Sequence, residues 1–297
     1  MYYIFVVNSR ADKASILDDV RKQISDVDIN YTLYRTKGPG DATRFVRLYC
    51  EFHPKEEVCF VACGGSGTFN EVASGVIGYS LKYVAFMAYG LTNDLTKYFE
   101  GRDFKSLRDI MDGEAMPIDA IRCNGEYAFN VASFGFEAMV GFEANMYAEA
   151  GDSKPYERGI VKSVFKSRYN NFKILADGRP ISKGRTLQVS VANARWCGGQ
   201  FMTAPTAIID DGYLDLVVFR AMSILSFARV VPKYASGKHI TDPFCQKYLT
   251  YRRIKHMEIS SPDIMFISLD GEITASTHFS VDVVPKAVTM MLPTKKS

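Results

Sequence analysis

The sequence lacks a long hydrophobic run and a strong excess of charge of either sign. Among 297 residues, 36 are Lys or Arg and 33 are Asp or Glu, so the formal net charge is only +3. This balance argues against a nucleic-acid-binding protein, which needs a polybasic surface. No apolar run approaches the roughly 18–20 residues of a membrane-spanning helix, and the N-terminus lacks the basic start of a signal peptide. We therefore expect a cytoplasmic protein, with attachment to the inner face of a membrane left open.

Metal-binding side chains are also sparse and scattered. Of the six cysteines only Cys59 and Cys63 lie close together, and no second pair completes a metal site. The four histidines are equally dispersed. We expect reduced thiols, several of them buried, rather than disulfides or a zinc site.

The first 118 residues alternate between two hydrophobic patterns. Short apolar runs predict strands at 2–7, 30–35, 58–62 and 83–88, and helical spacing of apolar residues predicts helices at 14–25, 41–50 and 69–77. Repeated strand–helix–strand units indicate a parallel sheet with right-handed crossovers. The expected fold class of this part is α/β, with a doubly wound sheet.

After about residue 118 the pattern becomes largely that of short strands. Segments 172–176 and 186–192 flank a stretch containing Asp177-Gly178, which predicts a hairpin. Further strands are expected at 214–220, 254–260, 265–269, 278–284 and 287–292, and helices at 137–147, 158–167 and 224–234. This part is predicted to be a β-rich, mainly antiparallel domain, a sandwich or a barrel.

A glycine-rich segment follows the third expected strand. It reads Gly64-Gly65-Ser66-Gly67-Thr68 and leads into a helix that contains Asn70 and Glu71. Glycines let the backbone approach a ligand, and a helix N-terminus adds partial positive charge, so the segment could cradle phosphate. It lacks the lysine of a P-loop. The alternative is a tight turn with no ligand.

A second polar segment, 89–94, follows the next strand and contains Asn93 and Asp94. In a doubly wound sheet the loops after neighbouring strands meet at the carboxyl edge, where ligands bind. Asn93 could donate to a phosphate or a base, and Asp94 could hold a neighbouring loop. Either residue could also serve only as the N-cap of a helix at 95–99.

Two acidic segments lie in the second half. Asp210 to Asp215 groups three carboxylates beside Gly212, which suits a hard cation, although a polar turn before a strand explains it equally well. Asp270-Gly271-Glu272 places two carboxylates on one side of an extended chain, where they could share base and metal chemistry. The alternative for this segment is an ordinary Asp-Gly turn.

These segments occur in one order, and in that order the chain resembles the diacylglycerol kinase catalytic-domain family of soluble bacterial lipid kinases. Sphingosine and ceramide kinases are relatives of this family, and NAD kinases are more distant ones. The resemblance covers nearly the whole chain. Beyond the segments above, the matching residues include Val7-Asn8, Thr36, Gly40-Asp41-Ala42, Gly90, Asn130, Gly135, Ala138, Asn193, Gly198-Gly199, Pro205, Ala207, Gly237 and His239.

The resemblance implies an ATP- and Mg²⁺-dependent kinase that phosphorylates a lipid hydroxyl, such as that of diacylglycerol. It implies a nucleotide-binding domain at 1–118, to which a tail from about 285 to 297 returns, and a β-rich sandwich domain for the lipid at 119–284, with ATP between them. The implied nucleotide-binding residues are Asn8, Thr36, Gly64, Gly65, Ser66, Gly67, Thr68, Asn70, Glu71, Asn93 and Asp94. The implied magnesium ligands are the Asp211 side chain and the carbonyls of Ile208 and Tyr213, and the implied base is Asp270 or Glu272.

The sequence departs from the family pattern near the expected phosphate site. Ser66 stands where the family has Asp, and Leu91 stands where it has Thr. Ala88 and Ser9 replace prolines, and Glu137 replaces an Asp. Three functions therefore stay open: a lipid kinase, impaired or altered in substrate; a nucleotide- or ligand-binding pseudokinase; and a kinase of NAD or another soluble substrate.

Partners follow from the same resemblance. The acceptor would be a lipid at a membrane surface, and a homodimer is one option for the oligomeric state. Apolar residues of 142–147 and 160–165 are candidates for the wall of a lipid pocket, or are ordinary core. Basic residues that could meet anionic headgroups, or form a solvated helix face, are Lys154, Arg158, Lys162, Lys166 and Arg168.

Overall fold

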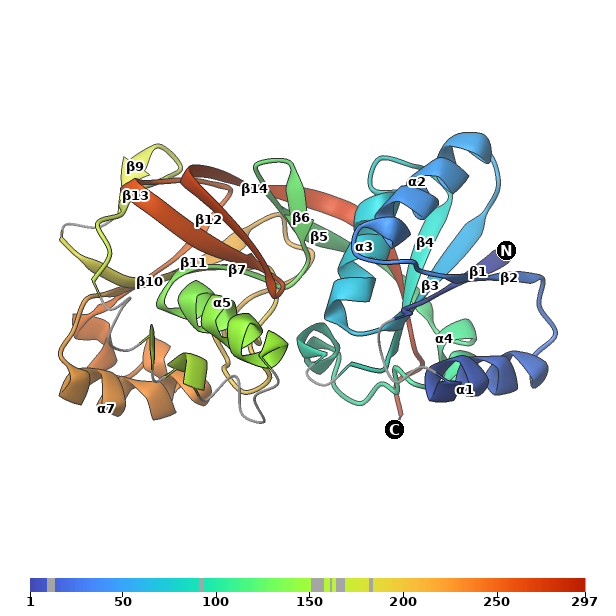
Figure 1. Ribbon diagram of the computed structural model, residues 1–297, viewed down its shortest axis with the longest axis horizontal. Coiled ribbons are helices and arrows are strands. Elements are labelled where there is room, and N and C mark those ends of the chain that lie inside the picture. The colour runs from blue at the N-terminus through green and yellow to red at the C-terminus, as the bar shows by residue number, and fades with distance from the viewer. Residues whose placement is uncertain are drawn as a thin grey trace. The chain divides into compact units, whose positions relative to one another are not determined.

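The computed structural model describes residues 1–9, 14–90, 93–150, 158–160, 162–163, 169–181 and 184–296. The chain forms two compact units (Figure 1). The first comprises Met1–Asp119 and Pro285–Ser297, and the second comprises Ala120–Val284. The chain leaves the first unit within β5 (Glu114–Cys123) and returns within β14 (Glu272–Leu292).

The first unit is built on a parallel sheet in the order β2-β1-β3-β4-β14. Its other strands are β1 (Tyr2–Val7), β2 (Tyr31–Arg35), β3 (Val58–Gly64) and β4 (Lys82–Ala88). Helices α1 (Ala14–Ser25) and α4 (Leu107–Met111) lie on one face, and α2 (Asp41–Phe52) and α3 (Ser66–Val76) lie on the other (Figure 1). This arrangement confirms the doubly wound α/β fold expected from the sequence.

The central strands are almost entirely apolar because both faces of the sheet are covered. Phe5 and Val61 pack with α1 and α4 in one core cluster. Residues that alternate with them meet the other helices: the Phe86 ring lies 5.1 Å from that of Phe69 in α3, and the Phe60 ring lies 5.8 Å from that of Tyr49 in α2. All seven residues of β3 are buried, which fixes the position of the glycine segment that follows.

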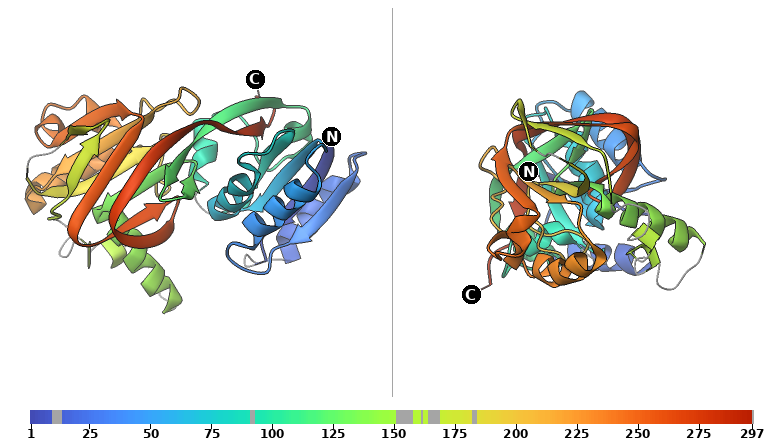
Figure 2. Two further views of the ribbon diagram at one scale, coloured as in Figure 1. Left: turned by 90° about the horizontal axis from the view of Figure 1, so that it is seen from above. Right: turned by 90° about the vertical axis from the view of Figure 1, so that its left-hand side faces the viewer.

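The second unit is β-rich, as predicted, with antiparallel neighbours in the order β12-β11-β10-β7-β13-β14. Its strands include β6 (Glu126–Ala128), β7 (Val131–Gly135), β10 (Thr186–Ala192), β11 (Leu214–Arg220), β12 (Leu249–Ile254) and β13 (His256–Leu269). In Figure 2 these strands lie side by side, with the green helix α5 (Phe136–Glu149) on one side of them. Helix α7 (Ile224–Ala235) packs on the same unit.

Several expected elements differ in this unit. The predicted hairpin of 172–176 with 186–192 is wrong in its pairing: β8 (Lys173–Ala176) turns at Asp177-Gly178 into the two-residue β9 (Arg179–Pro180) and pairs on its other side with β13. Segments expected as separate strands are joined in β13, which has an irregularity between Ser260 and Met265, and in the 21-residue β14. The reason is that long-range partners, rather than local turn signals, set these pairings.

Two segments that were expected to be helices are a 3-10 helix in one case and only partly described in the other. The segment after Asn93 forms a short 3-10 helix, η1 (Asp94–Tyr98), rather than a regular α-helix. Within the segment predicted as helix 158–167, residues 158–160 and 162–163 are helical and the others lie outside the described residues. No helix in the described parts of the chain is long and apolar enough to cross a membrane.

Candidate functional site

The strand order of the first unit identifies one edge as the place for a ligand. From β1 the chain moves outward to β2 and then returns to the other side of β1 to form β3. In open α/β sheets a ligand binds at the carboxyl ends of the strands where the order reverses in this way. The residues that leave these two strands are Asn8 after β1 and Gly65 after β3. Two segments singled out from the sequence therefore meet at this edge.

The glycine segment is partly helical, which corrects the sequence-based boundary. Helix α3 begins at Ser66 rather than at Phe69, with Gly65 as an extended N-cap at φ −93°. Ser66, Gly67 and Thr68 thus form the first helical turn, whose N–H groups have no acceptor within the helix. Ser66 and Gly67 are half-buried, so a ligand can reach this turn. A helix N-terminus of this kind attracts anions.

Glycine is required here because a side chain or a neighbouring backbone lies close to each position. A Cβ atom on Gly64 would lie 2.4 Å from Thr68 Oγ1, and one on Gly90 would lie 2.6 Å from the Cα of Gly65. The loop after β4 is tied to the end of β3, since Tyr89 N donates to the Gly64 carbonyl at 2.8 Å. The two loops therefore form one continuous backbone surface beside the start of α3.

Asn8 and Thr36 join this surface from the neighbouring strands. Asn8 Nδ2 donates to Thr68 Oγ1 at 2.9 Å, which links the end of β1 to the first turn of α3. Ser9 N donates to the buried Thr36 Oγ1 at 3.1 Å, which links the end of β1 to the end of β2. Both predicted residues thus lie at the expected edge and hold its loops together.

Glu71 has a supporting position. Its carboxylate accepts from the backbone N–H groups of Gly40, at 2.9 Å, and Ala42, at 3.1 Å, so it caps the start of α2. Asn70, on the same helix, is half-buried, and its Oδ1 accepts from the Ser74 hydroxyl at 3.3 Å. The Glu71 contacts tie α3 to the start of α2.

Asn93 and Asp94 stabilise the loop after β4. Asn93 lies in the left-handed region at φ 38°, and its Nδ2 donates to the Gly90 carbonyl at 2.7 Å. Asp94 is buried, and its Oδ1 lies 2.8 Å from Lys97 Nζ. Leu91, one of the departures from the family pattern, lies outside the described residues.

In the second unit, Asp270 and Gly271 form the tight turn between β13 and β14. Both have positive φ, 50° and 101°, as a two-residue type I′ hairpin requires. The Asp270 carboxylate accepts from backbone N–H groups of the segment that leads into β7: Phe129 N to Oδ2 at 2.7 Å, Val131 N to Oδ1 at 2.9 Å, and Asn130 N shared between both oxygens. Asp270 therefore anchors the turn to β7.

Glu272 has a different environment. It is the first residue of β14, and its side chain is exposed. The sequence left open whether Asp270 or Glu272 acts as a base. Since the Asp270 oxygens are occupied by backbone donors, the contacts favour Glu272 for proton transfer.

The predicted magnesium ligands lie on an exposed turn of the second unit. Asp211 Oδ1 accepts from Tyr213 N at 3.0 Å, and its Oδ2 forms an ion pair with Arg253. The Arg253 guanidinium also lies 4.5 Å from the centre of the Tyr213 ring. A cation thus already neutralises the carboxylate, so the turn in this arrangement does not fit Mg²⁺. Among the described residues, no group of three or more His, Cys, Asp or Glu side chains could hold a metal ion.

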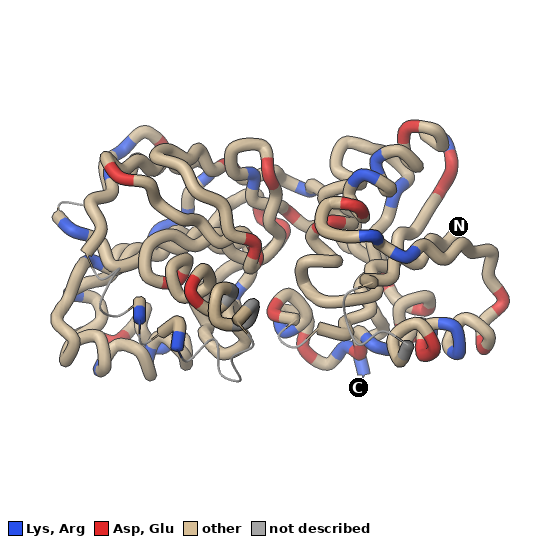
Figure 3. Tube along the Cα trace, in the orientation of Figure 1, with Lys and Arg blue, Asp and Glu red and all other residues tan. Residues whose placement is uncertain are grey.

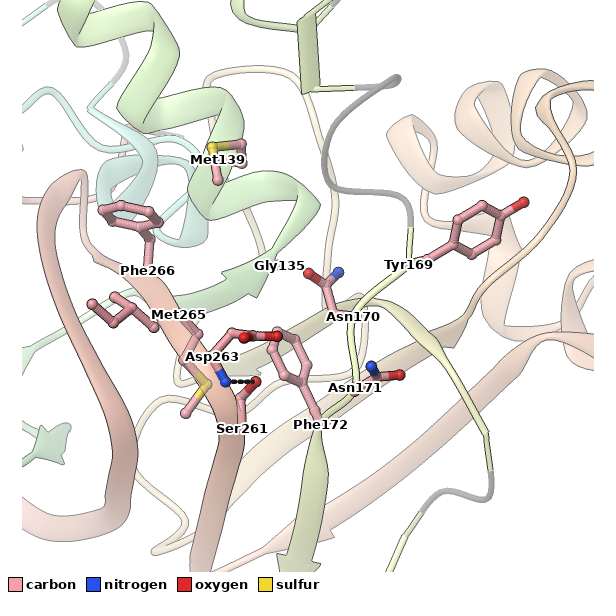
Figure 4. A pocket seen from close by; sticks show the side chains of 11 residues that line it. Gly135, Met139, Tyr169, Asn170, Asn171, Phe172, Ser261, Asp263, Met265 and Phe266 are labelled. Carbon is pink, nitrogen blue, oxygen red and sulfur yellow. Dashed lines mark hydrogen bonds between the residues drawn. The ribbon is translucent and has the colours of Figure 1, made fainter.

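A pocket of about 110 Å³ opens in the second unit between α5 and the irregular part of β13 (Figure 4). Met139 and Phe266 supply apolar walls, and Asn170 and Asp263 supply polar groups. Phe142, one of the residues expected to line a lipid pocket, stacks behind Phe266 with ring centres 4.6 Å apart. Side chains from several distant segments therefore meet here.

The basic residues predicted to meet headgroups have other contacts where they are described. Lys162 forms an ion pair with the buried Glu143, and both Arg158 and Lys162 lie over the ring of Tyr147. Lys154, Lys166 and Arg168 lie outside the described residues.

A buried polar network beneath α5 was not predicted. Glu137 Oε2 accepts from Ser133 Oγ at 2.7 Å, Gln188 Nε2 at 3.0 Å and Ser190 Oγ at 3.1 Å, and Gln188 continues to the Tyr234 hydroxyl at 2.8 Å. The available signal in the sequence was a pair of polar residues, Gln188 and Ser190, at alternate positions of a mainly apolar strand.

Comparison with known proteins agrees with this architecture. Residues 2–123 match the family described as "Diacylglycerol kinase catalytic domain", and residues 130–292 match the "YegS C-terminal NAD kinase beta sandwich-like domain". The chain is 25% identical over 262 residues to "Diacylglycerol kinase" of Bacillus subtilis, with 86% of this chain and 84% of that protein covered. It is 28% identical over 289 residues to "Probable lipid kinase YegS-like" of Pectobacterium atrosepticum, with 93% and 92% covered.

Solved structures extend the likeness at the level of fold. A diacylglycerol kinase from Bacillus anthracis superposes with a TM-score of 0.70 at 18% identity, covering 98% of this chain and 96% of that one. Yeast NADH kinase in complex with NADH superposes with a TM-score of 0.53 at 12% identity, covering 100% and 84%. The fold is thus that of the diacylglycerol and NAD kinases. The chain belongs to the diacylglycerol kinase catalytic-domain family of lipid kinases, with a YegS-type C-terminal unit, which confirms the resemblance found in the sequence.

Proposed function

We propose that this protein is a kinase that transfers the γ-phosphoryl group of ATP to the hydroxyl of a lipid such as diacylglycerol. The observation that carries the proposal is the continuous backbone surface beside the start of α3, which we call the phosphate cradle. There, Gly64, Gly65 and Gly90 bring two loops against the first turn of α3, at the edge where doubly wound folds bind ligands. The family and the names of its relatives support a lipid as acceptor.

The cradle supplies charge complementarity without a lysine. The N–H groups of Ser66, Gly67 and Thr68 and the helix dipole would bind the phosphate oxygens of ATP. Binding at fixed backbone donors would orient the γ-phosphorus for in-line attack, which is the main source of catalysis in phosphoryl transfer. Mg²⁺ that arrives with the nucleotide would neutralise part of the phosphate charge.

Glu272 is the base in this proposal. As the lipid oxygen forms a bond to the γ-phosphorus, the bond from that phosphorus to the β–γ bridging oxygen breaks, and ADP leaves. The proton of the lipid hydroxyl passes to the Glu272 carboxylate, which is exposed and therefore accessible. Asp270 holds the turn in place through the backbone of residues 129–131.

The test is phosphoryl transfer from radiolabelled ATP to diacylglycerol in mixed micelles. Glu272→Gln should lower turnover by at least tenfold while ATP affinity, measured by calorimetry, is unchanged. Glu126→Gln, another exposed glutamate of the second unit, is the matched control. Gly64→Ala should weaken ATP binding, because its Cβ would displace Thr68. Wild-type protein that binds ATP but phosphorylates no lipid would overturn the proposal.

A second function has one specific observation in its favour. Ser66 offers no carboxylate at the first turn of α3, where the family has an Asp. A protein with an intact cradle and no such carboxylate could bind a nucleotide without turnover, as a sensor. A rise in melting temperature with ATP, together with no transfer to lipid, NAD or other acceptors, would favour this function.

A further inference from the structure

Helix α7 has an apolar side that faces solvent. Its inner side buries Val230 and Tyr234, and Ser223 caps its start by accepting from Ser226 N at 3.2 Å. On the outer side, Ile224 is 44% exposed and Leu225 is 85% exposed. No other large hydrophobic side chain among the described residues is as exposed as Leu225.

The apolar side chains form a stripe rather than a single exposed residue. Ala228 and Pro232 are also exposed, and they follow Ile224 and Leu225 at helical spacing. Single exposed hydrophobic residues are normal on a protein surface, but a contiguous stripe needs a partner. The partner must accept an apolar helix face about two turns long.

The surroundings of this stripe are basic. From 220 to 247 the chain carries five Lys or Arg residues and a single acidic residue, Asp242, a net charge of +4 that exceeds the +3 of the whole chain. Asp242 is itself paired with Lys233. Lys238 and Arg229 are exposed, and the Arg229 guanidinium lies 4.2 Å from the centre of the Phe244 ring. In Figure 3 the tube around this helix is tan, with blue segments at several places.

Contacts connect the segment just before α7 to the pocket of the second unit. Ala221 N donates to the Arg185 carbonyl at 2.9 Å, and the Arg185 guanidinium lies 5.8 Å from the centre of the Tyr169 ring. Tyr169 lines the pocket and is 48% exposed, and Ile264, another lining residue, is 69% exposed. Exposed apolar side chains thus occur both at the pocket and at the helix tip.

We propose that α7 docks the protein on an anionic lipid bilayer. Ile224 and Leu225 enter the boundary between headgroups and acyl chains, and basic residues such as Arg229 and Lys238 bind the phosphate headgroups. A helix with one apolar side and basic flanks fits this surface. Docking in this way brings the pocket to its lipid acceptor, and in that respect the inference rests on the proposed function.

The test is flotation of the full chain with phosphatidylcholine vesicles that contain or lack phosphatidylglycerol. The double variant Ile224→Ser/Leu225→Ser should bind both kinds of vesicle at least tenfold more weakly, because two apolar side chains leave the bilayer. Arg229→Gln/Lys238→Gln should lose roughly 30-fold, at about 1 kcal/mol per basic residue, only on the anionic vesicles. High salt should remove this difference.

Matched control variants remove an exposed apolar side chain or exposed charges elsewhere on the surface, so they test whether the position on α7 matters. Phe52→Ser removes a side chain that is 79% exposed on α2, and Lys22→Gln/Lys55→Gln removes two exposed charges of the first unit. Both should bind vesicles as the wild type does, and circular dichroism should show that all variants are folded. Equal vesicle binding by the α7 variants and the wild type would overturn the inference. A change in the mass of the α7 variants by light scattering, with vesicle binding unchanged, would also overturn the inference. The stripe would then be an interface between copies of the chain.

Activity assays distinguish this inference from the proposed function. Turnover of a short-chain diacylglycerol in free solution should be the same in the α7 variants and the wild type, and turnover on vesicles should fall in proportion to binding. If no acceptor is phosphorylated while vesicle binding still depends on α7, the kinase proposal fails and the docking inference stands. If turnover on vesicles persists without any role for α7, the docking inference fails alone.

Discussion

The sharpest prediction concerns the Asp270 anchor, because the chain provides a matched control. Asp270→Asn keeps the shape of the side chain and suits the left-handed conformation at φ 50°, since Asn-Gly is favoured in type I′ turns. The change removes the charge and one of the two acceptor oxygens. Any loss of stability therefore reports the hydrogen bonds to residues 129–131 rather than strain in the turn.

The expected magnitude follows from those bonds. A hydrogen bond to a charged group contributes about 1.5–3 kcal/mol and one to a neutral group about 0.5–1.5 kcal/mol, so each retained bond weakens by roughly 1 kcal/mol. The amide nitrogen of the new Asn would face a backbone N–H, of Phe129 or of Val131, and leave it unpaired. An unpaired donor costs a further 1–3 kcal/mol or so. With two weakened bonds and one unpaired donor, we expect a total loss of about 3–5 kcal/mol, or roughly 6–20 °C in the melting temperature of a unit of this size.

Asp177→Asn is the control, assayed with Asp270→Asn by urea denaturation and calorimetry. Asp177 also precedes a glycine in a turn with positive φ, 46°, but both of its backbone donors, Lys255 N and His256 N, bind the same Oδ1 atom. Asn retains that oxygen and leaves no donor unpaired, so only the weakening of these two bonds remains, and this variant should lose at most about 2 kcal/mol. Equal losses at the two turns would refute the reasoning that Asp270 is special because both of its oxygens are used.

Three further predictions concern single side chains. Ser66→Asp should raise phosphoryl transfer about ten- to a hundredfold, the effect of about 1.5–3 kcal/mol from a charged contact; weaker ATP binding without turnover would contradict it and favour the sensor. Burial lowers the pKa of His239 to about 4, so the unfolded state binds more protons between there and 6.5. Stability should therefore fall by up to about 3 kcal/mol as pH drops through this window, and unfolding curves of His239→Gln should lack the slope. Arg253→Gln should free Asp211 and raise Mg²⁺ affinity about two- to fivefold by calorimetry, and an unchanged titration would argue against a metal site at this turn.

The first unit was largely predictable because its pattern is local. Its buried strands are short apolar runs, and the strands at 2–7 and 83–88 and the helix at 14–25 appear within one residue of their expected bounds. The start of α3 was misplaced because Ser-Gly-Thr favours a loop in isolation. The helix begins there since Gly65 acts as an extended N-cap and the backbone packs against Gly90.

The second unit was less predictable because its contacts join distant segments. At Asp270-Gly271 the turn was only the alternative to an extended segment, and nothing local shows that the Asp270 carboxylate binds the backbone of residues 129–131. Likewise, the Glu137 network joins residues more than 50 positions apart in the sequence. Side-chain partners of this kind depend on the pairing of β7 with β10 and β13, which no single segment specifies.

Ser66 bears differently on two properties that the family resemblance implies together, anion binding and metal handling. In the proposed function, anion binding at the start of α3 would depend on backbone N–H groups and on glycines at 64, 65 and 90, all of which are present. Metal handling depends on a carboxylate, and a serine hydroxyl carries no charge. A carboxylate at this first turn would also repel phosphate, so its absence leaves the cradle more positive. In the proposed function the departure at Ser66 would therefore affect turnover more than nucleotide affinity, and an assay that measures both quantities separates a slow kinase from a sensor.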